Sequence, residues 1–165
     1  MFNNPTTIVS NTRRFNINGP PKLNLYNCFD DYVSEELLTR SNAIYCNNCG
    51  KTSEAKTSNI IYKAPEVLII ILNRGKANKF KCDVNFPLIL DISKYVKIAD
   101  SPKKYNLIGV ISHLGQSSME GHFIAFCKHF DDSWHLFNDA IVTNVSESDI
   151  FRGTPYILFY QWDKL

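Results

Sequence analysis

The first strong hydrophobic pattern of the chain lies between Leu25 and Leu38, where apolar residues recur at spacings of three and four. Such spacing gives a helix one apolar stripe. The stripe consists of Leu25, Phe29, Tyr32, Val33, Leu37 and Leu38. The pattern predicts two short helices with a break near Ser34, whose side chain is suited to cap the second helix.

Farther along the chain the pattern becomes typical of strands. Val67–Leu72 is a continuous run of Val, Ile and Leu, which predicts a strand covered on both faces. Further strands are predicted at Ala55–Tyr62, Lys79–Phe86, Tyr105–His113, Phe123–His129, Trp134–Phe137, Ala140–Val145 and Tyr156–Trp162. A turn is predicted at Asn73–Asn78, and a short helix is predicted to begin around Ser146 and to end near Gly153.

The order of these elements predicts the fold class. Helices come early and strands come late, which indicates an α+β fold with a mostly antiparallel sheet and a few short helices. Residues 1–24 are rich in Asn, Thr and Pro and contain the breaker Gly19-Pro20-Pro21, so we expect a loosely structured entry segment with one edge strand. Residues 25–165 are expected to form the structured part, and 165 residues fit one domain or a large piece of one.

Composition narrows the class of protein. The 18 Lys and Arg residues are scattered and the formal charge is only +2, so nucleic acid is not an expected partner. The longest apolar run, Val67–Leu72, is too short to cross a bilayer, so no membrane association is expected. The five cysteines are spread out except for Cys46 and Cys49, which is not a disulfide framework and fits a reducing compartment. We therefore expect a cytoplasmic or nuclear protein.

The candidate chemistry lies between Tyr105 and Asp139. Gly121-His122-Phe123 follows a predicted strand and a small polar loop, and Asn138-Asp139 follows one hairpin later. A histidine at a strand start beside glycine holds its imidazole near a cleft rim, where a neighbouring amide or carboxylate can accept its ring N–H and fix its tautomer. This is the base-and-orienter half of a thiol or serine hydrolase. Because such a pair also occurs by chance in many proteins, these residues alone do not establish catalysis.

A colinear series of short motifs connects this segment to a known family. The motifs are Glu36-Leu37-Leu38, Tyr45-Cys46 through Cys49, Lys56, Ile60, Ala64-Pro65-Glu66-Val67-Leu68, Leu72-Asn73-Arg74, Lys81 through Val84-Asn85-Phe86-Pro87, Tyr105 to Gly115, Gly121-His122-Phe123, Trp134, Phe137-Asn138-Asp139 and Pro155-Tyr156-Ile157-Leu158-Phe159-Tyr160. Together they resemble the C-terminal part of the ubiquitin-specific protease domain, and the motifs from Tyr105 onward resemble its histidine box. The resemblance implies a papain-like fold of which this chain carries the fingers and the palm.

The resemblance also implies roles for individual residues. His122 matches the general base, which takes the proton of a cysteine nucleophile and later gives a proton to the leaving amine. Asn138 matches the third position of the triad, and the adjacent Asp139 is expected to share the orienting or electrostatic role. The other histidines are expected to be structural or surface residues: His113, His129 and His135.

The cysteine box of the family, a Gly- and Asn-rich motif that places the nucleophile at a helix N-terminus, has no match in this sequence. Cys82 and Cys127 lie in strand patterns and are expected to be small core residues, and Cys28 is expected to be half-buried on a helix. The chain alone is therefore expected to be inactive. Either an upstream segment of the same protein supplies the cysteine or the protein is a non-catalytic relative. We favour the first, because an inactive relative has no need of His122 and Asn138.

Cys46 and Cys49 have the spacing of half a tetrahedral zinc site. In the family such a pair meets a second cysteine pair from earlier in the chain, and residues 1–20 contain no cysteine. A structural zinc therefore requires ligands from elsewhere, and the alternative is a reduced knuckle whose shape is kept by its turn. A zinc ribbon that binds nucleic acid is a weaker explanation, and no cofactor is expected for catalysis.

Three functions follow as hypotheses. The first is a deubiquitinating thiol-dependent hydrolase that cleaves peptide or isopeptide bonds after the C-terminus of ubiquitin, with ubiquitin and ubiquitinated proteins as partners. The second is a pseudo-protease module that binds ubiquitin or scaffolds a complex, and the third is an α+β interaction domain unrelated to ubiquitin. Asn73 and Gly75 flank Arg74 in place of the usual Lys-Arg-Phe of the family, so substrate contacts in that segment are not expected to follow the family.

Overall fold

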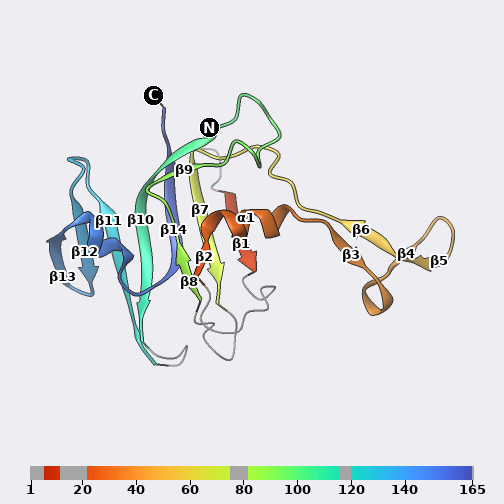
Figure 1. The fold of residues 1–165 in the computed structure, drawn as a ribbon, viewed down its shortest axis with the longest axis horizontal. Helices are drawn as coiled ribbons and strands as arrows, with labels where there is room; N and C mark the ends of the chain where they lie inside the picture. Colours follow the sequence, from red (N-terminus) through yellow and green to blue (C-terminus); the bar gives the residue numbers. More distant parts are fainter. Residues whose placement is uncertain (1–5, 12–21, 75–81, 116–119, 165) are drawn as a thin grey trace.

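The structure, a computed structural model, describes residues 6–11, 22–74, 82–115 and 120–164 (Figure 1). Its main feature is an eight-stranded sheet with the order β1-β7-β14-β10-β11-β12-β13, in which β9 also pairs with β10. The strands of this sheet are β1 Thr6–Asn11, β7 Val67–Asn73, β9 Ile89–Asp91, β10 Lys104–Leu114, β11 His122–Lys128, β12 Trp134–Asn138, β13 Ile141–Val145 and β14 Thr154–Trp162. Within it only β1 and β7 pair in parallel. The predicted α+β fold with a mostly antiparallel sheet is confirmed.

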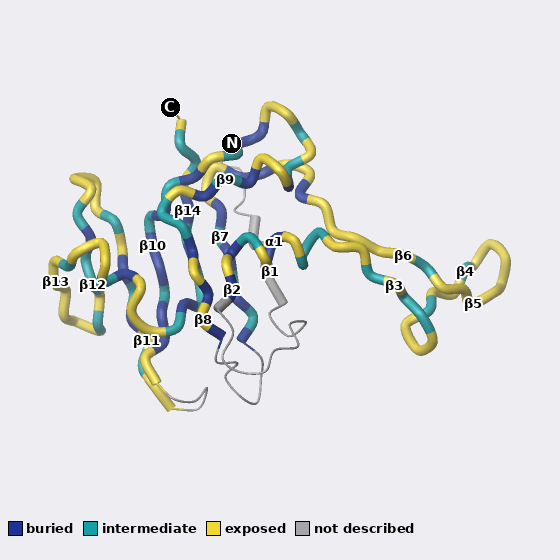
Figure 2. Tube along the Cα trace, viewed as in Figure 1, coloured by how far each residue is buried: buried dark blue, intermediate teal, exposed yellow. Residues whose placement is uncertain are grey.

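Smaller elements surround the sheet. They are α1 Leu25–Val33, the 3-10 helices η2 Arg40–Asn42 and η3 Glu147–Phe151, and the paired strands β2 Lys22–Asn24 with β8 Asp83–Asn85, β3 Glu36–Leu38 with β6 Ala55–Thr57, and β4 Ile44–Cys46 with β5 Lys51–Ser53. Figure 1 shows α1 lying across the sheet, while β3 to β6 extend away from it as a narrow projection. We call residues 36–57 the finger projection. Its residues are mostly exposed, whereas the buried residues gather in the sheet (Figure 2).

Helix α1 has clear limits because both of its ends are capped. Asn24 Oδ1 accepts the N–H of Tyr26 at 3.0 Å, and the N–H of Asn24 donates to Asn27 Oδ1 at 2.9 Å. These two bonds satisfy backbone donors that a helix N-terminus otherwise leaves unpaired. The N–H of Ser34 donates to Asp31 O at 3.2 Å and ends the helix.

The predicted second helix after Ser34 is wrong. Residues Glu36–Leu38 form β3 instead and pair with β6, and the side chain of Leu37 is 57% exposed. A helical stripe is stable where it packs on a core. This segment leaves the sheet to enter the finger projection, so strand pairing satisfies its backbone there.

The hydrophobic core lies on the side of the sheet that carries α1. Alternate residues of β7, β10 and β14 contribute to it: Leu68, Ile70, Leu72, Tyr105, Leu107, Val110, Leu158 and Tyr160. The two buried tyrosines are satisfied, because Tyr105 donates to Pro65 O and Tyr160 donates to Pro87 O, both at 2.6 Å. Without those acceptors, burial of the hydroxyl groups would be costly.

The other face of the sheet is only partly covered by the described residues. Ile69 and Ile71 are half-buried, so the prediction that their strand is covered on both faces is wrong. Cys127 is exposed rather than part of the core, because it lies on the less covered face of β11. Cys28 is fully buried, not half-buried, and Cys82 is buried as predicted.

The remaining predictions agree in part. The five strands from β10 to β14 are confirmed with ends that shift by at most two residues, and η3 is the short helix predicted after Ser146. Ala55–Tyr62 forms only the three-residue strand β6. The turn at Asn73–Asn78 and the start of Lys79–Phe86 lie largely outside the described residues. In the predicted entry segment, β1 is an edge strand of the sheet.

In the described part of the chain, no helix is long and apolar enough to cross a membrane.

Candidate active site

The candidate base and its orienter meet because β11 and β12 are antiparallel neighbours. His122 is the first residue of β11 and Asn138 is the last residue of β12, with Ala125 opposite Phe137 in the register between them. The two even-numbered residues therefore share one end and one face of the strand pair. His122 Nε2 and Asn138 Oδ1 are 2.6 Å apart, which is within hydrogen-bond distance.

This contact defines the tautomer of the imidazole. An amide oxygen only accepts, so His122 Nε2 must carry the proton and donate it to Asn138 Oδ1. In the neutral ring, Nδ1 then holds the lone pair and can accept a proton from a nucleophile. The side chain of His122 is 43% exposed, so the ring is accessible from outside the described part of the chain.

Asp139 contributes differently from Asn138. Its Oδ2 atom lies 3.8 Å from His122 Nε2, beyond hydrogen-bond distance, and its side chain is 82% exposed. Asp139 has a φ of 51° and is the first of two residues that connect β12 to β13, since Asn138 pairs with Ile141. This left-handed turn directs the carboxylate outward, so Asn138 is the residue that is hydrogen-bonded to the ring and Asp139 lies near the ring without a hydrogen bond.

The backbone before His122 rests on a buried histidine. His113, at the end of β10, is 4% exposed, and its ring packs on Phe123 at 4.7 Å and on Tyr156 at 5.8 Å between centroids. Gly121 has a φ of 150°, and a Cβ added there would overlap both the His113 ring and the Leu114 carbonyl. Glycine at this position lets the chain pass close over His113, which is the structural role predicted for that residue.

Arg74 is a further residue of this region whose role the sequence did not predict. It is 3% exposed, donates through Nε and Nη2 to Pro155 O at 3.1 and 2.7 Å, and donates through Nη1 to Cys82 O. Its guanidinium carbon also lies 5.9 Å from the centre of the Tyr156 ring. Burial lowers the pKa of the Arg74 guanidinium. In the segment where substrate contacts are not expected to follow the family, Arg74 thus connects the end of β7 to β14.

The cysteines lie away from the candidate base. Cys28 and Cys82 are buried, and the pair Cys46 and Cys49 lies in the finger projection. Cys127 lies five residues after His122 on the same strand, so the two side chains point to opposite faces. None of the five cysteines is therefore a nucleophile candidate beside the ring of His122.

The cysteine pair of the finger projection forms a knuckle at the β4–β5 turn. The N–H of Gly50 donates to Cys46 O at 2.9 Å, and Gly50 has a φ of 67°. Hydrogen bonds from the backbone N–H groups of Cys49 and Asn48, followed by that of the Cys49 side chain, lower the pKa of the Cys46 thiol. The described residues contain no group of three or more His, Cys, Asp or Glu side chains placed to hold a metal. Two thiolates are half of the tetrahedral zinc set, so they do not complete a site by themselves.

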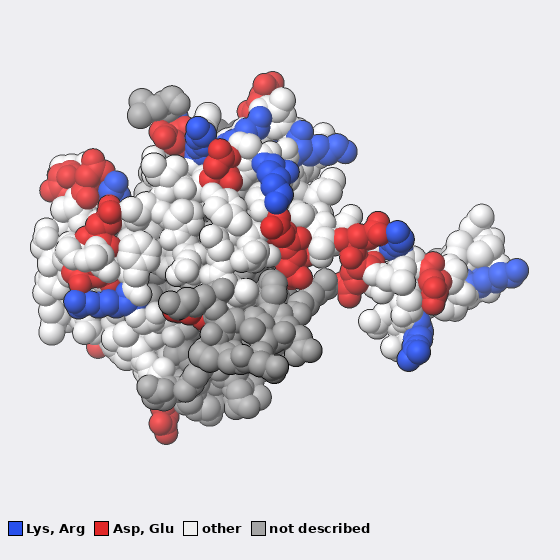
Figure 3. All heavy atoms as spheres, viewed as in Figure 1, with Lys and Arg blue, Asp and Glu red and all other residues white. Residues whose placement is uncertain are grey.

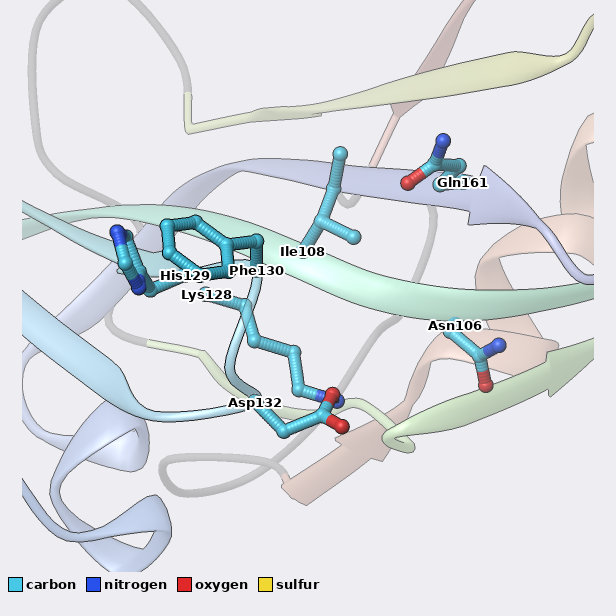
Figure 4. A pocket seen from close by; sticks show the side chains of 7 residues that line it. All are labelled: Asn106, Ile108, Lys128, His129, Phe130, Asp132 and Gln161. Atoms are coloured by element: carbon cyan, nitrogen blue, oxygen red, sulfur yellow. The ribbon is translucent and has the colours of Figure 1, made fainter.

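A separate surface cavity of about 370 Å³ lies at the opposite end of β11 (Figure 4). Its walls are formed by Asn106, Ile108, Lys128, His129, Phe130, Asp132 and Gln161. His129 packs on the exposed ring of Phe130, with 3.9 Å between centroids, and its Nδ1 lies 3.1 Å from Asp131 Oδ1. This agrees with the surface role predicted for His129, and the cavity contains none of the three candidate catalytic residues.

An imidazole that lies 2.6 Å from an amide oxygen on an adjacent strand has the arrangement of base and orienter found in the class of nucleophile-and-base hydrolases. The sequence profile of the family "Ubiquitin carboxyl-terminal hydrolase" matches residues 33–160. Ubiquitin carboxyl-terminal hydrolase 8 of Saccharomyces cerevisiae is 31% identical over 96% of this chain and 36% of its own length. Ubiquitin carboxyl-terminal hydrolase 5 of Arabidopsis thaliana is 34% identical over 84% of this chain and 16% of its own length.

Solved structures agree with the sequence comparison. The SAGA Ubp8/Sgf11/Sus1/Sgf73 DUB module bound to ubiquitin aldehyde contains a chain that matches with a TM-score of 0.70 and 31% identity. A second structure of the yeast SAGA DUB module, with a substituted Sgf73, matches with a TM-score of 0.72, 32% identity, 87% of this chain and 35% of that chain. The protein belongs to the ubiquitin carboxyl-terminal hydrolase family, in its ubiquitin-specific protease branch. The chain spans about a third of the length of the yeast relative.

Proposed function

We propose that this chain carries the base half of a deubiquitinating thiol hydrolase that cleaves peptide or isopeptide bonds after the C-terminus of ubiquitin. The observation that carries the proposal is the 2.6 Å contact of His122 Nε2 with Asn138 Oδ1, which leaves Nδ1 as the proton acceptor. The nucleophilic cysteine comes from a segment upstream of these residues in the same protein. Ubiquitin and ubiquitinated proteins are the substrates, by analogy with the ubiquitin aldehyde bound to the yeast module.

In the proposed reaction His122 Nδ1 accepts the thiol proton, and the sulfur attacks the carbonyl carbon of the last ubiquitin residue. The same proton is then given to the leaving amine as the bond to it breaks, which leaves a thioester. Water attacks the thioester with His122 again as base, and the carboxylate of ubiquitin and the free thiol are released. Asn138 holds the ring in one orientation through both steps.

The experiment uses the full-length protein that contains these residues and a ubiquitin whose C-terminus carries a fluorescent leaving group. Cleavage is expected, and His122→Ala is expected to lower kcat by several orders of magnitude. Residues 1–165 alone are expected to give no cleavage and no adduct with a thiol-reactive ubiquitin probe. Full-length protein that binds ubiquitin without turnover, with binding unaffected by His122→Ala, would instead establish the alternative, a non-catalytic scaffold module.

The proposal includes two further statements. A structural zinc binds at Cys46 and Cys49 where a second cysteine pair is supplied from elsewhere, because the knuckle provides two thiol groups, which are half of the tetrahedral ligand set. The protein acts in the cytoplasm or the nucleus, which is supported by the spread of its five cysteines, a pattern that is not a disulfide framework. Neither nucleic acid nor a membrane is proposed as a partner.

A further inference from the structure

Strand β13 is the edge of the sheet next to the candidate active site. The strand order ends at β13, which pairs with β12 through residues 141–145 without a register shift, and no other described strand pairs with it. Its sequence, Ile-Val-Thr-Asn-Val, has no proline, lysine or bulge. Natural proteins usually protect edge strands with such features, because unpaired backbone groups accept further strands. Figure 1 shows β13 at one extreme of the molecule.

The register shows which backbone groups of β13 point away from the sheet. A two-residue connection joins Asn138 to Ile141, and the pair that closes such a hairpin exchanges hydrogen bonds between its own strands. Hydrogen-bonded and non-bonded pairs alternate along antiparallel strands. Val142 and Asn144 therefore direct their N–H and C=O groups outward, which offers an added strand four backbone hydrogen bonds.

Apolar side chains frame this edge on both faces. Ile141 is 64% exposed on the face that carries His122, and Val142 is 52% exposed on the other face, next to Phe137 at 40%. An extended segment with alternating β-branched residues would cover these side chains as well as the backbone. The edge thus offers both components of strand addition, the main-chain bonds and the side-chain contacts.

The charge around β13 indicates the kind of segment that fits. Asp139 precedes β13 and Glu147 follows it, whereas Asp149 already pairs with Arg152 at 2.7 Å, which leaves Asp139 and Glu147 as the acidic residues at the two ends of the strand. Figure 3 shows acidic side chains, with Lys or Arg side chains among them, on the side of the molecule where Figure 1 places β12 and β13. A second copy of the chain is disfavoured, because antiparallel self-pairing centred on Thr143 brings Asp139 of each copy to the Glu147 end of the other.

We propose that β13 is a docking edge for an extended segment of a partner protein, with β-branched residues at its centre and Lys or Arg at its ends. The segment adds to the sheet as an antiparallel strand through Val142 and Asn144. Its basic ends lie against Asp139 and Glu147. This inference does not depend on the proposed hydrolase activity.

The test uses the full-length protein and a labelled synthetic peptide with a central Val-Thr-Val-Thr sequence and two lysines at each end. Binding followed by fluorescence anisotropy should weaken as salt is added, and it should be weaker for the same peptide with glutamates at its ends. Amide hydrogen exchange should slow at Val142 and Asn144 when the lysine peptide is bound. Neighbouring Thr143, already bonded to β12, should change little.

Two variants at one position separate strand addition from adhesion to a charged surface. Asn144→Pro removes an outward N–H without removing a bond to β12, and proline is tolerated at such edge positions. It should weaken binding at least about fivefold. Asn144→Ala is the matched control, keeps the N–H and should bind within about twofold of the natural protein. Thermal melting of both variants checks that the sheet is intact.

Three results would overturn the proposal. Equal binding by Asn144→Pro and Asn144→Ala, with both variants folded, would show that the outward backbone is not used. Unchanged exchange at Val142 and Asn144 in the presence of saturating peptide would exclude strand addition. A concentration-dependent dimer of the full-length protein that Asn144→Pro abolishes would identify a second copy as the occupant. Because none of these measurements uses ubiquitin, their failure is distinguishable from failure of the proposed activity.

Discussion

Removal of the amide of Asn138 tests the geometry of the candidate site most directly. Asn138→Leu keeps the approximate size of the side chain and removes the acceptor that lies 2.6 Å from His122 Nε2. During the proposed reaction His122 becomes an imidazolium, so the lost bond is one to a charged group and is worth about 1.5–3 kcal/mol. At about 1.4 kcal/mol for each factor of ten, kcat of the full-length protein should fall roughly 10- to 150-fold.

Asp139 provides the matched comparison. Its carboxylate is 3.8 Å from the same nitrogen and 82% exposed, so water screens its attraction to the imidazolium. Coulomb's law with the dielectric constant of water gives about 1 kcal/mol, or about fivefold in rate, for Asp139→Asn. At 1 M salt, where the Debye length is about 3 Å, this penalty should fall below about twofold. The penalty for Asn138→Leu should change little with salt, because that variant loses a short hydrogen bond to His122 and not a long-range charge interaction.

The assay is cleavage of ubiquitin carrying a C-terminal fluorescent group, measured at low and at high salt. Asn138→Asp serves as the control, because it keeps an oxygen in place to accept the His122 N–H. The double change at Asn138 and Asp139 should cost more than either single change. If Asp139→Asn lowers kcat more than Asn138→Leu does, the carboxylate is the orienter and the assignment from distance is wrong.

Three further predictions concern stability, thiol reactivity and metal. Arg74→Leu should lower the free energy of unfolding in urea by about 3 kcal/mol, because the change removes the donors that bond the carbonyls of Pro155 and Cys82. The control Arg152→Leu removes an exposed ion pair and should lower the free energy of unfolding by under about 1 kcal/mol. Iodoacetamide at neutral pH should alkylate Cys46 before Cys82, because the lowered pKa of Cys46 increases its thiolate fraction, whereas Cys82 is buried and has a raised pKa. Mass spectrometry would contradict this if Cys82 reacted first in the folded chain. Elemental analysis of residues 1–165 after dialysis should find less than one zinc per chain, and one tightly held zinc would show that other ligands complete the finger site.

The strands near the candidate site were predictable because their signals are local. From β10 to β14 the expected ends lie within two residues of the observed ends, and the hairpin that joins β11 to β12 is short. A hairpin brings its first and last residues to the same end, so His122 and Asn138 were expected to meet. The alternation of residues along the strands did not decide whether Asn138 or Asp139 faces the His122 ring, because the turn that rotates Asp139 away depends on the positive φ of Asp139.

Predictions failed where packing overrides a local pattern. The apolar spacing through Leu37 matches a helix equally well, and only the departure of the chain from the sheet makes that segment a strand. Cys127 lies in an apolar strand, but burial depends on which face of β11 is covered, and that is set by elements distant in sequence. The burial of Arg74 depends on the carbonyl of Pro155, which lies 81 residues away in the sequence. The parallel pairing of β1 with β7 also joins segments that are distant in the sequence.

The two incomplete sites of this chain differ in what each lacks. The pair His122 and Asn138 is assembled by β10, β11 and β12 alone. The buried ring of His113 packs against Gly121 and Phe123, the two residues that flank His122. Because Nε2 is bonded to Asn138, the proposed reaction requires only that a nucleophile be placed beside Nδ1 on the side opposite Asn138. Cys46 and Cys49 have a formed turn but only half of a ligand set, so no rearrangement of that turn alone completes a zinc site. In the proposed reaction the base is therefore oriented before the rest of the site is present, whereas the proposed zinc of the finger projection needs a second pair of ligands.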